Sequence, residues 1–205
     1  ARESGVPASF VVATTELSED DAVVALARDE GIDHVRGPVE DVLSRFLMAS
    51  EGRDESVVIR LTGDCPLLDP AVIARTVAAF ESQDVDYLSS TLERTLPRGL
   101  DVEVFSASAL RRAGEEAEGV DRVHVTSYLY RHPERFRVAG LTFEPHAGDL
   151  RVTLDTAEDA AALDAIVREL GDRPPAWTEV VDLLRRRPDI AALNSDVVQK
   201  DIEEG

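Results

Sequence analysis

The chain has 205 residues and a net charge of −19, and 21 of its 22 basic residues are arginine. So acidic a surface repels nucleic acid and anionic membranes, which excludes both as partners. The single cysteine, Cys65, excludes an internal disulfide, and no apolar stretch is long enough to span a membrane. We therefore expect a cytoplasmic protein whose acidity reflects either a high-salt habitat or the codon bias of a high-GC genome.

The first half of the chain alternates short apolar runs with amphipathic segments. Strands are expected at residues 10–14, 32–36 and 57–61, and helices at 21–30, 39–49 and 70–82. The helix at 21–30 is expected to bury Val23, Leu26 and Ala27, and the next helix a stripe that begins at Val39. Strands that alternate with helices of this length predict βαβ units. The fold class is therefore α/β with a mostly parallel central sheet.

The stretch at residues 57–70 combines a strand, a sharp turn and a helix start. The apolar run from Val57 shows no alternation, which is typical of a strand buried on both faces of a parallel sheet. The run ends at Thr62-Gly63-Asp64, and Asp69 with Pro70 opens a helix. Open α/β sheets bind ligands at the carboxyl ends of central strands, where Asp64 stands. A second interpretation, in which Asp64 only caps a tight turn, fits the spacing equally well.

The second half has a less regular pattern. Strands are expected at residues 85–88, 100–104, 136–143 and 150–154, and helices from 106, over 121–131 with His124, after 155 and around Val180. The alternation from Leu100 to Val104 indicates a half-exposed strand, in a small antiparallel extension of the sheet. Residues 150–154 indicate a buried strand that runs into Asp155. On its own, Asp155 also fits a helix N-cap with Glu158 as its capping-box partner. The acidic end from Asp201 is expected to be frayed.

Six motifs occur in order along almost the whole chain. They are Ala13-Thr14-Thr15; Arg36-Gly37 with Asp41-Val42-Leu43 and Arg45-Phe46; Arg60 through Pro70; Pro97 through Phe105; His124-Val125-Thr126; and Leu154-Asp155-Thr156 with Glu158-Asp159. Together they resemble the spore coat polysaccharide biosynthesis protein F family. That family is similar to the cytidylyltransferases that activate sialic acids and 3-deoxy-manno-octulosonate. The resemblance extends to about residue 193.

The resemblance implies a three-layer, Rossmann-like nucleotidyltransferase fold and an enzyme that transfers a nucleotide from a nucleoside triphosphate to a sugar. It further implies that the enzyme transfers CMP from CTP to a sugar or sugar acid and releases pyrophosphate. It also implies a role in surface polysaccharide or glycan biosynthesis, and a homodimer. Two other hypotheses stay open. One is a glycosyltransferase that uses a nucleotide sugar, and the other is a non-catalytic relative that acts as a subunit or interaction module.

The resemblance also implies roles for individual residues. Asp64 and Asp155 fall on the two aspartates that hold Mg²⁺ in such enzymes, as catalytic and metal-binding residues. Nucleotide contacts fall on Thr14, Arg36, Arg60, Thr62 and Gly63, and sugar contacts fall on Asp101, Glu103 and His124. For Arg36 and Arg45, pairing with nearby carboxylates is the alternative to phosphate binding. Cys65 is expected to be a small buried residue with no nucleophilic role.

The family begins with a strand and a loop of the form Ala-Arg-x-Gly-Ser-x-Arg-Leu-Pro-x-Lys that holds the triphosphate. No such stretch occurs in this sequence, and its first residues, Ala1 to Ser4, resemble the last turn of a helix. We therefore expect residues 1–205 to form a single nucleotidyltransferase-like domain that lacks its N-terminal strand and phosphate-binding loop.

Overall fold

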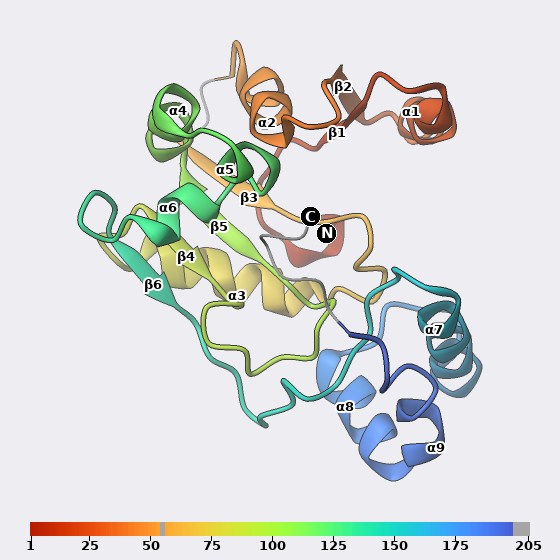
Figure 1. Ribbon diagram of the computed structural model, residues 1–205. Coiled ribbons are helices and arrows are strands. Elements are labelled where there is room, and N and C mark those ends of the chain that lie inside the picture. The colour runs from red at the N-terminus through yellow and green to blue at the C-terminus, as the bar shows by residue number, and fades with distance from the viewer. Residues whose placement is uncertain (54–55, 199–205) are drawn as a thin grey trace. The chain divides into compact units, whose positions relative to one another are not determined.

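The computed structural model describes residues 1–53 and 56–198 (Figure 1). They form two compact units, each built from segments that are distant in the sequence. The first unit comprises residues 1–6, 59–104 and 139–198, and the second comprises 7–53, 56–58 and 105–138. Helices and strands are present in both units, which confirms the predicted α/β class. No helix among these residues combines the length and the apolarity that a membrane span requires.

The second unit contains a parallel pair of strands, β1 (Val11–Thr15) and β2 (Asp33–Gly37). Figure 1 shows this pair between helices α1 (Asp21–Asp29) and α2 (Val42–Ser50), which both contact the two strands. Helix α2 begins where the Asp41 carboxylate accepts the Ser44 N–H at 2.9 Å, and it buries Leu43. It also contacts α4 (Ala107–Glu116) and α5 (Val120–Val123).

The first unit is organised around α3 (Pro70–Glu81), which contacts β4 (Tyr87–Ser89) and the short 3₁₀ helix η1 (Arg2–Ser4). Asp69 caps α3 as predicted, since its carboxylate accepts the Ala71 N–H at 2.7 Å. The other oxygen of Asp69 accepts the Trp177 N–H at 2.8 Å, at the start of α8 (Trp177–Arg186). One buried carboxylate therefore fixes two helices that are far apart in the sequence.

Two further helices and three strands complete the first unit or extend into it. Helix α7 (Ala157–Leu170) packs against α8 and against the short α9 (Pro188–Ala191). A four-stranded sheet has the order β3-β5-β4-β6, with β3 at Val57–Arg60, β5 at Glu103–Ser106 and β6 at Val138–Gly140. Strands β3, β5 and β6 each contribute residues to both units.

Four predicted features of strands are wrong. The strand at 57–61 is not central, because β3 stands at one edge of the four-stranded sheet and its residues are only half-buried. The predicted half-exposed strand at 100–104 is buried throughout β5 up to Phe105. The long strand at 136–143 shortens to the three residues of β6. Residues 150–154 make no strand, and within the described part of the chain their ladder contact is an isolated parallel bridge between Arg98 and Arg151.

Helices also depart from the predictions in three places. The expected helix at 121–131 is broken into α5 and α6 (Ser127–Arg131), because Val125 between them has a φ of 59°. In α1, Val24 is buried in place of Val23, and Leu26 is 62% exposed. Val39 lies before α2 and is exposed. The acidic end from Asp201 lies outside the described residues.

Candidate functional site

Asp64 lies in the tight turn that follows β3, and the main chain beside it belongs to residues 153–154. The Leu154 N–H donates to the Asp64 carbonyl oxygen at 2.8 Å, and the Thr153 hydroxyl donates to the same oxygen at 3.1 Å. The Thr153 hydroxyl is also 3.3 Å from the carboxylate Oδ2 of Asp64. Asp155 is the next residue along the chain. The main chain of Asp64 therefore lies against the residues that precede Asp155, through these hydrogen bonds and not through the expected pair of buried strands.

Asp155 is held by an arginine that the sequence analysis did not single out. The Arg151 guanidinium, 10% exposed, donates to Oδ2 of Asp155 at 2.6 Å and to both carboxylate oxygens of Asp159 at 2.8 Å. Asp159 is fully buried, whereas the Asp155 side chain is 42% exposed. Arg151 thus connects a carboxylate inside the fold to one that faces solvent.

Asp159 is the centre of this cluster. Its carboxylate accepts the Asp155 and Thr156 N–H groups at 3.0 and 3.2 Å and the side-chain amide of Asn194 at 2.7 Å. The Arg151 guanidinium, followed by Asn194 and these backbone donors, holds the pKa of Asp159 well below its usual range. The main chain at Asp155 is consequently fixed by a charged group that stays ionised at neutral pH.

The start of α7 corrects one alternative interpretation. Asp155 is not the N-cap and Glu158 is not its capping-box partner. Thr156 is the N-cap, its side-chain oxygen accepts the Asp159 N–H at 3.2 Å, and the Asp159 side chain returns to the Thr156 N–H. Since Thr156 caps the helix, the Asp155 carboxylate is not part of its N-cap.

Hydrogen bonds hold the turn at residues 95–101 against residues 150–153, which lead to Asp155. The Arg98 N–H donates to the Leu150 carbonyl at 2.9 Å, and the Val152 N–H donates to the Arg98 carbonyl at 2.7 Å. Gly99 has a φ of 101°, and a Cβ there would lie 2.5 Å from the Thr153 nitrogen. Only glycine permits this approach. Residues 98–99 therefore lie directly against the chain that leads to Asp155.

Arg60 and Glu103, predicted to bind nucleotide and sugar respectively, are bound to each other. The buried Glu103 carboxylate accepts from the Arg60 guanidinium and, at 2.5 Å, from the Tyr87 hydroxyl. Burial acts against the charge of Arg60, but the adjacent Glu103 carboxylate raises the pKa of Arg60 above its usual value. The other sugar-binding candidate in this unit, Asp101, accepts two hydrogen bonds from Arg94 at 2.7 and 3.2 Å.

The remaining candidates of the first unit lie in the turn after β3. The Thr62 hydroxyl is 3.1 Å from the sulfur of Cys65, and burial raises the pKa of that thiol to about 12. Cys65 is therefore a buried thiol at neutral pH, as predicted. Gly63 is exposed, and a Cβ there would meet open space. The fold itself does not require glycine at this position.

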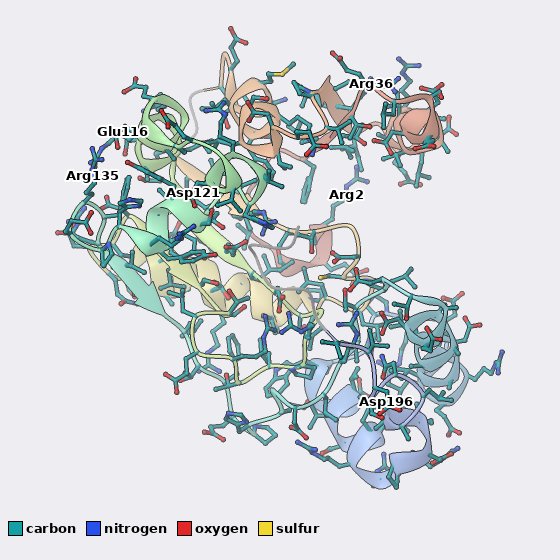
Figure 2. All side chains as sticks on the ribbon, in the orientation of Figure 1. Arg2, Arg36, Glu116, Asp121, Arg135 and Asp196 are labelled. Atoms are coloured by element: carbon teal, nitrogen blue, oxygen red, sulfur yellow. The ribbon has the colours of Figure 1, made fainter. Side chains whose placement is uncertain are left out.

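Thr14 and Arg36 belong to the second unit, where both take part in the turn after β1. Hydrogen bonds from the hydroxyls of Thr15 and Thr14 lower the pKa of Asp20 to about 2. Arg36 donates to the carbonyls of Thr15 and Leu17 and forms an ion pair with Asp21 at 2.7 Å (Figure 2). Pairing, the predicted alternative for Arg36, is what the structure contains.

Two other residues considered in the sequence, Arg45 and His124, also belong to the second unit. Arg45 is 9% exposed and packs its stem against Gly37, with its Nε bonded to no group in the described chain. His124 is the C-cap residue that follows α5, just before Val125 in its left-handed conformation. A β-branched residue in that conformation costs roughly 1–3 kcal/mol, and such strain is typical of functional segments. Figure 2 also shows Glu116 and Arg135 of this unit side by side, paired at 2.6 Å.

The donor set at Asp64 and Asp155 fits a magnesium ion better than a metal bound by protein ligands alone. Within residues 1–53 and 56–198, no three His, Cys, Asp or Glu side chains are grouped so that they could hold a metal. Mg²⁺ needs only one or two carboxylates when substrate phosphates and water complete its octahedron. Asp64 and Asp155 offer two carboxylates on adjacent main-chain segments, and the Asp155 side chain is 42% exposed.

A comparison with protein families shows which family the chain belongs to. The family model described as "Cytidylyltransferase" matches residues 1–176. The chain belongs to the cytidylyltransferase family. It is accordingly a nucleotidyltransferase, which confirms the predicted class of enzyme and favours it over the two other hypotheses. The match ends just before α8, so Asn194, which binds Asp159, lies beyond the matched residues.

The chain is also similar to individual proteins over most of their length. The chain is 35% identical over 188 residues to the spore coat polysaccharide biosynthesis protein SpsF of Bacillus subtilis, covering 89% of this chain and 77% of that protein. It is 34% identical over 200 residues to an uncharacterized protein of Methanocaldococcus jannaschii, covering 95% of this chain and 80% of that protein. A solved cytidylyltransferase structure from Leptospira borgpetersenii matches with a TM-score of 0.84 at 26% identity, covering 93% and 80% of the two chains. The Rossmann-like cytidylyltransferase fold is thereby confirmed.

Proposed function

We propose that the protein transfers CMP from CTP to a hydroxyl group of a sugar or sugar acid, within the synthesis of a surface polysaccharide or another glycan. The acceptor oxygen forms a bond to the α-phosphorus of CTP, the bond from that phosphorus to the β-phosphate breaks, pyrophosphate leaves, and the hydroxyl proton is released. Membership of the cytidylyltransferase family supports the donor, and the similarity to SpsF supports the pathway.

The observation that carries this proposal is the placement of Asp64 and Asp155. Hydrogen bonds from Leu154 and Thr153 hold the main chain of Asp64 against the residues that precede Asp155. We assign these two carboxylates to one Mg²⁺ ion, with the remaining ligands supplied by phosphate oxygens and water. A bound Mg²⁺ would supply neutralisation of charge on the transferring phosphoryl group.

The other candidate residues of the first unit take three different roles in this proposal. Thr62 and Gly63 form the turn that precedes Asp64, and the open space over Gly63 allows a phosphate or ribose to approach the main chain, so we keep both as nucleotide contacts. Asp101 remains a proposed sugar contact. Because the polar groups of Arg60 and Glu103 are engaged with each other, we assign both of them a structural part.

For the second unit, the roles of Thr14, Arg36 and His124 in substrate binding stay predictions. The hydroxyl of Thr14 and the guanidinium of Arg36 already bind groups of their own unit. A homodimer and a cytoplasmic location also stay predictions, and light scattering in solution tests the first of them.

The proposal is tested by measuring pyrophosphate release from CTP, with a panel of neutral sugars and sugar acids as acceptors and with Mg²⁺ or EDTA present. We expect release that depends on an acceptor and on Mg²⁺, and that is faster with CTP than with ATP, GTP or UTP. Asp64→Asn, checked by its melting temperature, serves as the inactive control. Release from no nucleotide with any acceptor, or undiminished release in EDTA, would contradict the proposal.

A further inference from the structure

The substrates of the proposed reaction carry several negative charges, and the protein itself carries a net charge of −19. A site of this kind needs cations that are not already neutralised. Of the arginines predicted to contact the nucleotide, Arg60 is bound to Glu103 and Arg36 is bound to Asp21. The anionic substrate therefore has to find its counter-charge elsewhere.

Arg98 is an arginine of the first unit whose guanidinium is not paired with a carboxylate among the described residues. Within the described part of the chain its guanidinium has no hydrogen bond and no ion pair, although the side chain is partly buried. Its two arginine neighbours differ, because Arg94 is held by Asp101 and Arg151 by Asp155 and Asp159. Arg98 thus stands beside the proposed metal site with its donors unused.

The position of Arg98 is set by the main chain. Its N–H and carbonyl bind Leu150 and Val152, the preceding Pro97 is buried, and the following Gly99 lies against the Thr153 nitrogen. The Thr153 hydroxyl in turn donates to the Asp64 carbonyl. A rigid backbone therefore presents the guanidinium beside the residues that lead to Asp64 and Asp155. Such pre-organisation lowers the cost of binding a ligand.

The electrostatic setting of Arg98 is unfavourable in the absence of an anion. Burial lowers the pKa of Arg98, and the nearby charges of Arg94 and Arg151 lower it further, against opposing contributions from Asp101 and Asp155. A desolvated cation without a partner reduces the stability of a fold. Residues that reduce stability in this way are retained where a function needs them.

We propose that Arg98 binds an oxyanion of the substrates, which is either a phosphate group of CTP and pyrophosphate or the carboxylate of a sugar acid acceptor. The planar guanidinium can donate two parallel hydrogen bonds to either group. This inference rests on the proposed function for the identity of the two anions. It adds a specificity-determining residue, since an arginine used for the acceptor carboxylate would select sugar acids over neutral sugars.

The test compares wild-type protein with Arg98→Gln, Arg98→Lys and the control Arg111→Gln. Arg111 is exposed on α4, has no hydrogen bond or ion pair among the described residues, and gives the same loss of charge. We expect Arg98→Gln to melt at the same temperature as wild type or above it, because no bond is lost. A residue with a purely structural role would instead lower the melting temperature when replaced.

Calorimetry then measures binding of inorganic pyrophosphate, D-glucuronate, N-acetylneuraminate and D-glucose. We expect Arg98→Gln to weaken binding of pyrophosphate or of the sugar acids by roughly 10- to 100-fold, the range for a hydrogen bond to a charged group. Arg98→Lys should lose less, Arg111→Gln should match wild type, and D-glucose should not respond to any of the changes. Loss confined to pyrophosphate assigns Arg98 to phosphate, and loss confined to the sugar acids assigns it to the acceptor.

The proposal is overturned if Arg98→Gln binds every anion as tightly as wild type, or if wild type binds none of them. These outcomes are separate from those of the proposed function. Pyrophosphate release from CTP by wild type, with unchanged anion binding in Arg98→Gln, contradicts only the assignment of Arg98. Anion binding that depends on Arg98, in a protein that releases no pyrophosphate, contradicts only the proposed reaction.

Discussion

Two networks of the first unit each pair an arginine with a buried carboxylate, but only one of them extends to an exposed carboxylate. In one, Arg60 and Tyr87 bind Glu103, and the carboxylate is buried. In the other, Arg151 binds the fully buried Asp159 and also Asp155, which is 42% exposed. The first network therefore closes within the fold, whereas the second uses a buried carboxylate to position one that can meet a ligand.

This difference in burial predicts which carboxylate matters for stability and which for activity, and the sequence alone does not reveal it. Glu103 and Asp155 both belong to or follow apolar-rich runs, and each pairs with an arginine. Breaking a buried pair leaves a desolvated charge and is costly, whereas an exposed pair contributes about 0–1 kcal/mol. Replacement of Glu103 should thus change folding, and replacement of Asp155 should change chemistry.

The largest effect is expected from Asp155→Asn and Asp64→Asn. Each change removes one negative charge from the proposed Mg²⁺ ligands, and we expect pyrophosphate release to fall roughly 10²- to 10³-fold, the range for loss of one preorganised charge-stabilising group. Melting temperature should stay within a few degrees of wild type for Asp155→Asn. Titration with Mn²⁺, followed by paramagnetic relaxation of water, should show weakened metal binding in both variants. Undiminished Mn²⁺ binding in either one would exclude that residue as a ligand.

Glu103→Gln should have the largest effect on folding. It leaves the Arg60 guanidinium half-buried without its counter-charge, so we expect the free energy of unfolding to fall by about 3 kcal/mol, the lower end for a broken buried pair. Denaturant unfolding measures this loss. The double variant Arg60→Met with Glu103→Gln should recover part of it, because the unpaired cation is gone. A loss below about 1 kcal/mol in the single variant would show that water already solvates this pair.

Asp159→Asn is expected to affect both stability and metal binding, since Asp159 is buried and also positions Asp155. It removes the charge that Arg151, Asn194 and two backbone N–H groups bind, and we expect a loss of about 2 kcal/mol in stability. Mn²⁺ affinity should fall as well, by less than in Asp155→Asn. Unchanged metal affinity would mean that Arg151 alone orients the Asp155 carboxylate.

The same residue gives a pH dependence. Because the pKa of Asp159 is lowered in the folded protein, its contribution to stability is complete above the unfolded value of about 3.9 and is lost as pH falls through the folded value. Wild-type stability should therefore drop on acidification below about pH 4, and the drop should be smaller in Asp159→Asn. Melting curves between pH 2 and pH 7 compare the two proteins, and equal slopes would contradict the assignment.

Features with local signals were predictable from the sequence. The Asp69 cap with Pro70 at the start of α3, and Ser106 as the N-cap of α4, are set by residues within one helical turn. Asp64 was singled out because it follows an apolar run and a tight turn, whereas the role of Asp155 came from the family resemblance. The capping box of Thr156 and Asp159 also had a local signal, the spacing of a threonine and an acidic residue three positions later.

Other features depend on partners that are distant in the sequence. Alternation made Glu103 look exposed, but Arg60, 43 positions away, satisfies its charge inside the fold. Asn194 reaches Asp159 from 35 positions away and has no signal of its own. The apolar run at 150–154 is held mainly by loop contacts to Arg98 and Asp64, which periodicity does not report. That Arg98 has no partner among residues 1–53 and 56–198 is likewise visible only in three dimensions.

The smallest effect is expected from salt, and it sharpens the contrast between buried and exposed pairs. Surface carboxylates at a net charge of −19 repel one another, and the reach of that repulsion shortens from about 10 Å at 0.1 M salt to roughly 3 Å at 1 M. Exposed pairs such as Arg185 with Asp149 are weakened by salt too, but each contributes little. The melting temperature should therefore rise by a few degrees between low salt and 1 M KCl. Since the Arg60–Glu103 pair is screened much less, Glu103→Gln should show the same rise from a lower starting point. A flat or falling melting temperature in wild type would leave codon bias as the better explanation of the acidic composition.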